Sequence, residues 1–135
     1  MRRTELREHI FKMLFCTEFN TEDEMKEQEK LYFELLDMAT EAEEDYVIDK
    51  YKAILERKEE VDTLLNEYAD KWKTTRMNKV DLSILRLAAY EILWDEDVPT
   101  AVAINEAVEL AKKYSSDEGP AFINGILARV VEKYV

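Results

Sequence analysis

One histidine and one cysteine are the most reactive side chains in this sequence, so nucleophilic and thiol chemistry have little material. His9 and Cys16 lie seven residues apart, which on a shared helix separates them by about 10 Å along its axis. A nucleophile and its base must be within hydrogen-bond reach of each other, so these two residues do not form a catalytic pair. We expect Cys16 to pack in the core and His9 to lie at the surface or at its boundary.

Metal and phosphate motifs are also incomplete. Residues 45–56 begin and end like a calcium-binding loop, but Val47 occupies a ligand position and Lys50 the position that requires glycine. Gly119 and Gly125 are too few and wrongly spaced for a phosphate-binding motif. The sequence also lacks a Glu-x-x-His di-iron motif. We therefore expect no enzymatic activity, no metal and no cofactor.

The elements that position the side chains are expected to be helices. The 135 residues include 2 Gly and 2 Pro, too few for the turns of a β-sheet protein, and 47% are hydrophobic. No apolar run approaches the roughly 20 residues of a membrane span, and the first ten residues lack the apolar core of a signal peptide. We expect a single all-α domain over residues 1–135, located in the cytoplasm and without contact to a membrane.

The first helix is predicted to have two apolar faces. One core-facing stripe at helical spacing comprises Leu6, Ile10, Met13 and Leu14. Thr4 is the expected N-cap of this helix. Phe11, Phe15 and Phe19 recur every four residues, and Phe15 and Phe19 point away from that stripe. Either another helix of the same domain covers this second face, or it is a docking site for a partner.

Six more helices are predicted along the rest of the chain. After a break at residues 20–21, a second helix is marked by Leu31, Leu35 and Met38. Residues 46–72 form two helices with a break near Arg57 and Lys58. Residues 80–94 are apolar almost all round, which predicts a helix surrounded by others. The sixth and seventh helices follow residue 99 and the loop at residues 115–119.

The last two helices carry specific expectations. Thr100 is predicted to cap the sixth helix. In the seventh, Asn124 and Gly125 cost about 1 kcal/mol or more in helix propensity. We expect close helix packing at Gly125 and an Asn124 amide that ties down a neighbouring loop. The seven helices are expected to form two packed bundles, at about residues 1–75 and 76–135.

Charge is unevenly distributed in a chain with a net charge of −12. Residues 17–49 carry two lysines against thirteen acidic residues, a pattern typical of a solvated helical face. Residues 71–86 carry five basic residues against Asp81, which predicts a local basic surface. The overall charge disfavours a sequence-independent grip on nucleic acid by the whole surface.

Several specific strings stand out in the sequence: Trp72 with Arg76, DLSILRLAAYE at residues 81–91, and VPTAVAINEAVELAKKYSSDEGPAFINGIL at residues 98–127. Together they resemble the NusB family of bacterial transcription antitermination factors. Arg3, Arg7 and Phe15 fit the N-terminal helix of the family, so the likeness extends over nearly the whole chain. It is weakest from residue 18 to about residue 45.

The resemblance implies a fold of two helical bundles without catalytic activity. Family members bind the boxA element of ribosomal RNA leader transcripts, as single-stranded RNA, together with NusE, a small-subunit ribosomal protein. The complex is loaded onto RNA polymerase, which then reads through terminators. Carried over by position, the RNA-binding residues are Arg2, Arg3, Arg7, Asp117, Glu118 and Phe122. The positions that match the NusE interface are Phe15, Phe19 and Asp81.

Two alternatives stay open. A similar helical domain serves as the RNA-binding module of ribosomal RNA cytosine methyltransferases, although those proteins are much longer. The chain could also be a homodimeric interaction protein that buries the second face of its first helix and the basic stretch around Arg76 against a second copy.

Overall fold

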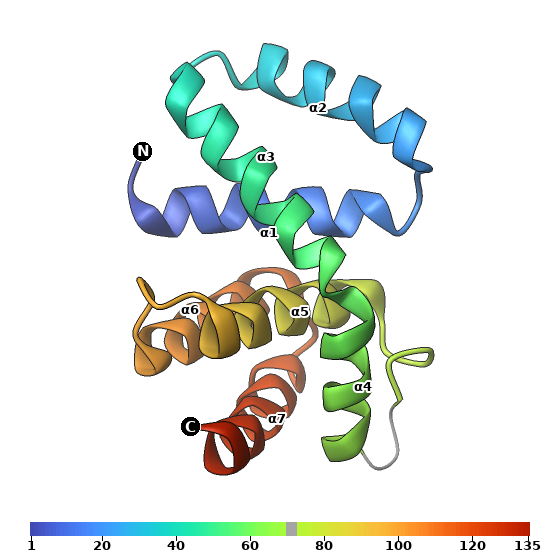
Figure 1. The fold of residues 1–135 in the computed structure, drawn as a ribbon, viewed down its shortest axis with the longest axis vertical. Helices are drawn as coiled ribbons and strands as arrows, with labels where there is room; N and C mark the ends of the chain where they lie inside the picture. The colour runs from blue at the N-terminus through green and yellow to red at the C-terminus, as the bar shows by residue number, and fades with distance from the viewer. Residues whose placement is uncertain (70–72) are drawn as a thin grey trace. The chain divides into compact units, whose positions relative to one another are not determined.

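The computed structural model describes residues 1–69 and 73–135. Lys71 of the predicted basic stretch and Trp72 of the family resemblance lie outside the described residues. Every regular element in the described ranges is an α-helix, so the all-α prediction is confirmed. The elements are α1 (Arg3–Thr17), α2 (Glu22–Leu36), α3 (Glu41–Glu56), α4 (Lys58–Tyr68), α5 (Lys79–Trp94), α6 (Thr100–Tyr114) and α7 (Gly119–Tyr134) (Figure 1). No helix in this described part combines the length and apolar character that crossing a bilayer requires.

The chain divides into two compact units, Met1–Leu55 and Glu56–Val135. The sequence predicts a division between bundles near residue 75, whereas the structure places the boundary between units at the end of α3. The reason lies in α4, which packs against α5 and α7 and therefore belongs to the second unit.

In the first unit, α1 buries the predicted stripe, since Ile10, Met13 and Leu14 are at most 2% exposed. The N-cap prediction is wrong, because α1 begins at Arg3 with Arg2 at the cap position. The predicted break at residues 20–21 is confirmed. Thr21 caps α2 by a reciprocal pair of bonds, in which its hydroxyl accepts from the Glu24 amide and its own amide donates to the Glu24 carboxylate.

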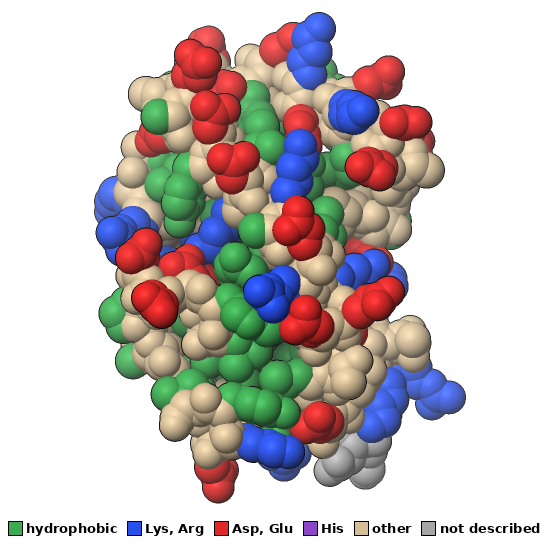
Figure 2. Space-filling model, in the orientation of Figure 1, with side chains coloured by type: hydrophobic (Ala, Val, Ile, Leu, Met, Phe, Trp, Pro, Cys, Tyr) green, Lys and Arg blue, Asp and Glu red, His purple; other side chains and the backbone are tan. Residues whose placement is uncertain are grey.

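The buried face of α2 differs from the predicted one. Met25 and Phe33 are buried, whereas Leu31 and Leu35 are 51% and 77% exposed. Met38 lies beyond the helix, which ends at Leu36, and is also exposed. The polar surface of this unit carries many of the carboxylates of residues 17–49, several of which are visible in Figure 2.

In the second unit, α5 packs against α4, α6 and α7, as its all-round apolar sequence predicts. Ile84, Leu85 and Ala89 on α5 have no exposed surface. The break between α3 and α4 falls at Arg57, as predicted. The Thr100 prediction is wrong, because Pro99 occupies the N-cap position of α6 and Thr100 is the first helical residue.

The packing expected at Gly125 is also wrong. Gly125 is exposed, and a Cβ atom added there would meet nothing within 4 Å. The exposed Asn124 amide holds no loop, since it has no hydrogen-bond partner among the described residues. Close packing occurs instead at Gly119, the buried first residue of α7.

Candidate functional site

The turn that leads into α7 carries three of the predicted RNA-binding residues. Asp117 and Glu118 are exposed, and Phe122 is half-buried on the first turn of the helix. Glu118 occupies the N-cap position, where its carbonyl accepts a hydrogen bond from the Phe122 amide at 3.1 Å. This bond fixes the separation between the backbones of Glu118 and Phe122, which lie one helical turn apart.

A buried carboxylate holds this turn against the start of α5. Asp81 is 6% exposed, and its Oδ1 atom accepts a hydrogen bond from the Ser115 hydroxyl at 2.5 Å. Its Oδ2 atom accepts from the side-chain amide of Asn78 at 2.9 Å, while the side-chain Oδ1 of Asn78 caps α5 by accepting from the Asp81 backbone N–H at 2.8 Å. Both carboxylate oxygens of Asp81 are thus used within the second unit.

Gly119 completes this arrangement because it leaves room for Ser115. A Cβ atom at position 119 would lie 2.0 Å from the Ser115 Oγ and 2.5 Å from its Cβ. Real Cβ atoms do not approach other atoms so closely, so any larger residue must displace the serine. Gly119 was not among the predicted site residues, although it is one of only 2 glycines in the chain.

Asn78, Asp81 and Gly119 take part in lining a hollow of about 290 Å³ in the second unit. Asp81, Glu118 and Phe122 were predicted site residues, and Asp117 does not line the hollow. The residues that line it are Arg76, Met77, Asn78, Asp81, Ser116, Glu118, Gly119 and Phe122. The structure therefore brings one residue predicted for the partner protein together with two predicted for RNA.

Arg76 is the cation of this hollow, and it comes from the predicted basic stretch. Its side chain is exposed, as is that of Lys73. Arg86, from the same stretch, is buried and donates to the Asp62 carboxylate at 2.9 and 2.7 Å. The local excess of positive charge in the sequence could have identified Arg76, but it could not tell Arg76 from Arg86.

In the first unit, the predicted RNA-binding arginines differ in exposure. Arg2 and Arg3 are exposed, and Arg2 makes an exposed ion pair with Glu5 at 3.3 Å. Arg7 is 7% exposed. Arg2 and Arg3 are therefore the predicted arginines of α1 and its cap that present their charge to solvent.

The phenylalanine row of the first unit runs from the core to the surface. Phe11 is buried, Phe15 is half-buried, and Phe19 is 63% exposed just after the end of α1. The Phe15 and Phe19 rings contact each other edge to face, with their centroids 5.1 Å apart. This pair offers an exposed aromatic surface of the kind that anchors protein interfaces.

The two reactive side chains of the first unit, His9 and Cys16, are both partly buried. His9 is half-buried, and its Nδ1 atom shares a hydrogen bond with the Tyr32 hydroxyl. Burial lowers the pKa of His9, which keeps the imidazole neutral at physiological pH. Burial raises the pKa of the Cys16 thiol, so the thiolate that reacts with electrophiles is scarce.

Comparison with known proteins gives a family and a fold. The model of the NusB family matches residues 4–132. The transcription antitermination protein NusB of Agathobacter rectalis is 51% identical over 129 residues, which are 96% of this chain and 98% of that protein. The structure of T. maritima NusB superposes with a TM-score of 0.86 at 32% identity and covers 99% of this chain and 93% of that one.

A further solved structure shares the fold. It is described as a crystal structure of the antitermination factors NusB and NusE in complex with double-stranded RNA, and it matches with a TM-score of 0.83 at 20% identity. The match covers 98% of this chain and 97% of that one. With the family model matching nearly every residue and a relative identical at about half of the aligned positions, the chain belongs to the NusB family.

Proposed function

We propose that this protein is a transcription antitermination factor that binds boxA RNA of ribosomal RNA leader transcripts together with NusE. In this proposal the complex joins RNA polymerase in the cytoplasm and lets it read through terminators. The observation that carries the proposal is membership of the NusB family over almost the whole chain. A neighbour of the same fold, solved with NusE and RNA, is the precedent for the two partners.

The RNA side of the proposal uses charge and stacking. Arg2 and Arg3 are exposed, so they can pair with phosphates, and Arg7 follows on the same helix. The ring of Phe122 offers a face on which a splayed base can stack. Asp117 and Glu118 accept hydrogen bonds from base amino groups and repel phosphates, which favours particular bases at a cost in affinity.

The NusE side uses the aromatic pair of the first unit and the carboxylate of the second. Phe15 and Phe19 supply an apolar anchor, of which Phe19 is the more exposed ring. The two carboxylate oxygens of Asp81 already accept hydrogen bonds from Asn78 and Ser115. Asp81 therefore acts on this side by positioning the turn before α7 against the start of α5. The proposal therefore assigns direct contact to the phenylalanines and a positioning role to Asp81.

Replacing two exposed arginines tests the RNA side. The double variant Arg2→Ala with Arg3→Ala should bind a boxA oligonucleotide more weakly and lower the slope of log K against log salt by about 0.7 for each phosphate that it no longer neutralises. The matched control is Lys26→Ala with Lys30→Ala, which removes the same charge from the exposed surface of α2. A slope equal to that of the control would remove these arginines from the RNA site.

Truncating one exposed ring tests the NusE side. Phe19→Ala should reduce affinity for NusE by about 2 kcal/mol or more, the typical cost of losing an interface anchor. Leu35→Ala is the control, because Leu35 is another large apolar residue that is 77% exposed. Calorimetric titration with purified NusE distinguishes the two variants, and equal effects would contradict the assignment.

A further inference from the structure

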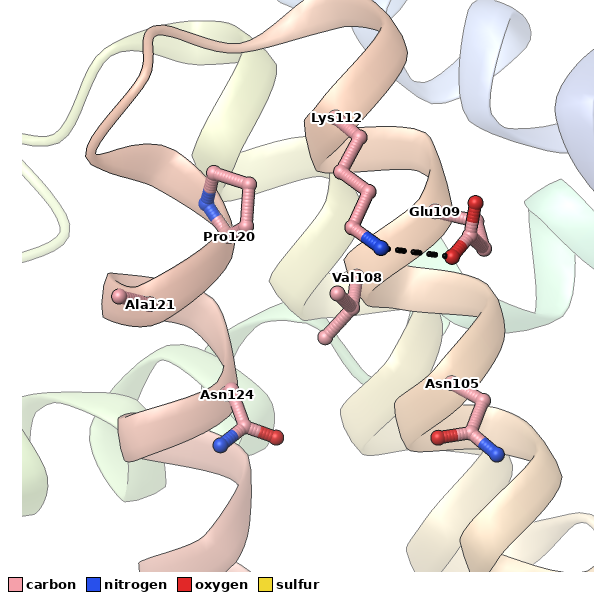
Figure 3. Close-up of a pocket in the computed structure, with 7 residues that line it drawn as sticks. All are labelled: Asn105, Val108, Glu109, Lys112, Pro120, Ala121 and Asn124. Carbon is pink, nitrogen blue, oxygen red and sulfur yellow. Dashed lines mark hydrogen bonds and ion pairs between the residues drawn. The ribbon is translucent and has the colours of Figure 1, made fainter.

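A groove runs between α6 and α7, beside the turn that carries the predicted RNA-binding residues. Asn105, Val108 and Lys112 line it from α6, and Pro120, Ala121 and Asn124 line it from α7 (Figure 3). The groove has a volume of about 550 Å³, which is ample for a nucleotide. It lies wholly within the second unit, where α6 and α7 pack against each other and both pack against α5.

The two asparagines are the unexplained residues of the groove. Both side chains are solvent-accessible, and neither amide has a hydrogen-bond partner in the part of the chain that the structure describes. Asparagine is a weaker helix former than alanine by roughly 0.5 kcal/mol or more at such positions. Gly125 adds a further cost that no close packing within this unit offsets. These residues therefore lower the stability of α6 and α7, and no contact within the second unit compensates for that loss.

We propose that this groove is a base-reading subsite for single-stranded RNA, in which the amides of Asn105 and Asn124 bind the edges of bases. The inference rests on the proposed function and extends the RNA surface past residues 117–122. An asparagine amide presents a donor and an acceptor side by side, which matches the N6 and N7 atoms of adenine. Single-stranded RNA exposes these edges because its bases are not paired.

The rest of the groove suits a nucleotide. The side chains of Val108, Pro120 and Ala121 are small and apolar, so they contact the face of a base without filling the groove. Lys112 lies at the rim, where its amine donates to Glu109 at 3.1 Å in an exposed pair. Exposed ion pairs are worth little, so a phosphate can replace the carboxylate of Glu109 at small cost.

The polar groups of the groove favour RNA as its occupant. Two solvent-accessible asparagine amides and an exposed lysine line it, and such groups bind base edges and phosphates. It is also continuous with the candidate RNA site, since the first turn of α7 carries Phe122 toward the hollow beside Asp81 and Pro120 toward the groove.

A titration with extended oligonucleotides tests the subsite. The core probe is boxA RNA, and the test probes carry four extra adenosines or four extra uridines at the 5′ or the 3′ end, each measured with NusE present. For the unmodified protein, adenosines at one end should raise the affinity more than uridines do. Asn105→Ala and Asn124→Ala should each reduce that gain by about fivefold or more and leave binding of the core probe unchanged.

Each variant has a matched control. Asn105→Ala and Asn124→Ala replace solvent-accessible helical residues by alanine, so they should preserve or raise the melting temperature. Glu132→Ala is an exposed substitution elsewhere on α7 and should keep the full adenosine gain. Lys112→Ala should lower the salt slope for the extended probe, whereas Lys113→Ala, which does not line the groove, should leave it unchanged.

The outcomes separate the two proposals. If the core probe binds and both asparagine variants keep the adenosine gain, the subsite is refuted and the proposed function stands. If either variant weakens binding of NusE without RNA, the groove is a protein interface and the subsite is refuted as well. If no probe binds even with NusE, the proposed function fails and the subsite fails with it.

Discussion

The two glycines of α7 should respond in opposite ways to the same substitution. At position 119, a new Cβ atom would lie 2.0 Å from the Ser115 Oγ, whose hydrogen bond to Asp81 would have to break or move. At position 125, the new atom would meet nothing within 4 Å. Neither glycine has a positive φ, so alanine fits the backbone at both positions.

The structure sets the size of each effect. Forcing a methyl group into a packed site costs about 1–3 kcal/mol. Loss of a hydrogen bond to a charged group costs about 1.5–3 kcal/mol. Removing glycine from the unfolded chain returns about 0.4–1 kcal/mol. We therefore expect Gly119→Ala to lower the free energy of unfolding by about 1.5–5.5 kcal/mol, and Gly125→Ala to raise it by about 0.5–1 kcal/mol.

A double-mutant cycle isolates the steric cause. Ser115→Gly removes both atoms that the new methyl group would meet, so adding Gly119→Ala in that background should cost little further stability. Urea denaturation followed by tryptophan fluorescence reports on the second unit, because both tryptophans of the sequence come after residue 56 and Trp94, with its ring under the Arg57 guanidinium, ends α5. Far-UV circular dichroism checks that the unfolding is that of the helices.

Two results would refute this reasoning. If Gly119→Ala is as stable as the unmodified protein, the turn is not tightly packed in solution. If the two substitutions at positions 115 and 119 are additive, the cost does not come from their contact. The turn also sets the backbone positions of Glu118 and Phe122, so Gly119→Ala should weaken RNA binding as well as lower the free energy of unfolding. Gly125→Ala should only raise the free energy of unfolding.

Three further predictions concern a buried ion pair and two titrating groups. Asp62→Ala should lower the free energy of unfolding by about 1.5–3 kcal/mol, because it removes the carboxylate that accepts two hydrogen bonds from the buried Arg86 guanidinium; a loss below about 1 kcal/mol in urea denaturation would contradict this. Burial and a hydrogen bond to Glu29 raise the pKa of the Tyr51 hydroxyl above its usual 10. The contribution of Tyr51 to the free energy of unfolding should therefore be complete below pH 10 and decrease above it. This decrease should be shallower in Tyr51→Phe. Burial lowers the pKa of His9 below 6.5, so its contribution should be complete above pH 6.5 and decline in acid, and an NMR titration with an unshifted midpoint would refute the assignment.

Local sequence patterns were sufficient for the helices. The spacing of Ile10, Met13 and Leu14 located α1, and the all-round apolar character of residues 80–94 identified α5 as the helix that others surround. These patterns succeed because helical periodicity relates residues within one or two turns. The same patterns failed for α2, where Met25 and Phe33 are buried in place of Leu31 and Leu35. A helix with apolar residues on several sides, such as α2, has more than one face that can be buried, and its neighbours decide which.

The candidate site divides in the same way. Glu118 and Phe122 could be placed together from the sequence, because they belong to one helical turn. The hydrogen bond between Asp81 and Ser115 could not be predicted, because the two residues are 34 positions apart in the chain. The sequence also could not distinguish exposed Arg76 from buried Arg86, which carry the same charge in the same stretch.

Composition, periodicity and a few long strings thus determined that this chain is all-helical, where most of its helices lie and which family it belongs to. The packing of α5, α6 and α7 decided which polar groups are consumed internally and which face solvent. As a result, Asp81 is buried and hydrogen-bonded whereas Glu118 faces solvent. In the same way, Gly119 is closely packed whereas Gly125 is exposed. The sequence alone does not distinguish the members of either pair. The physical reason is that burial and hydrogen bonding depend on atoms that distant segments bring together, and a local pattern holds no information about those atoms.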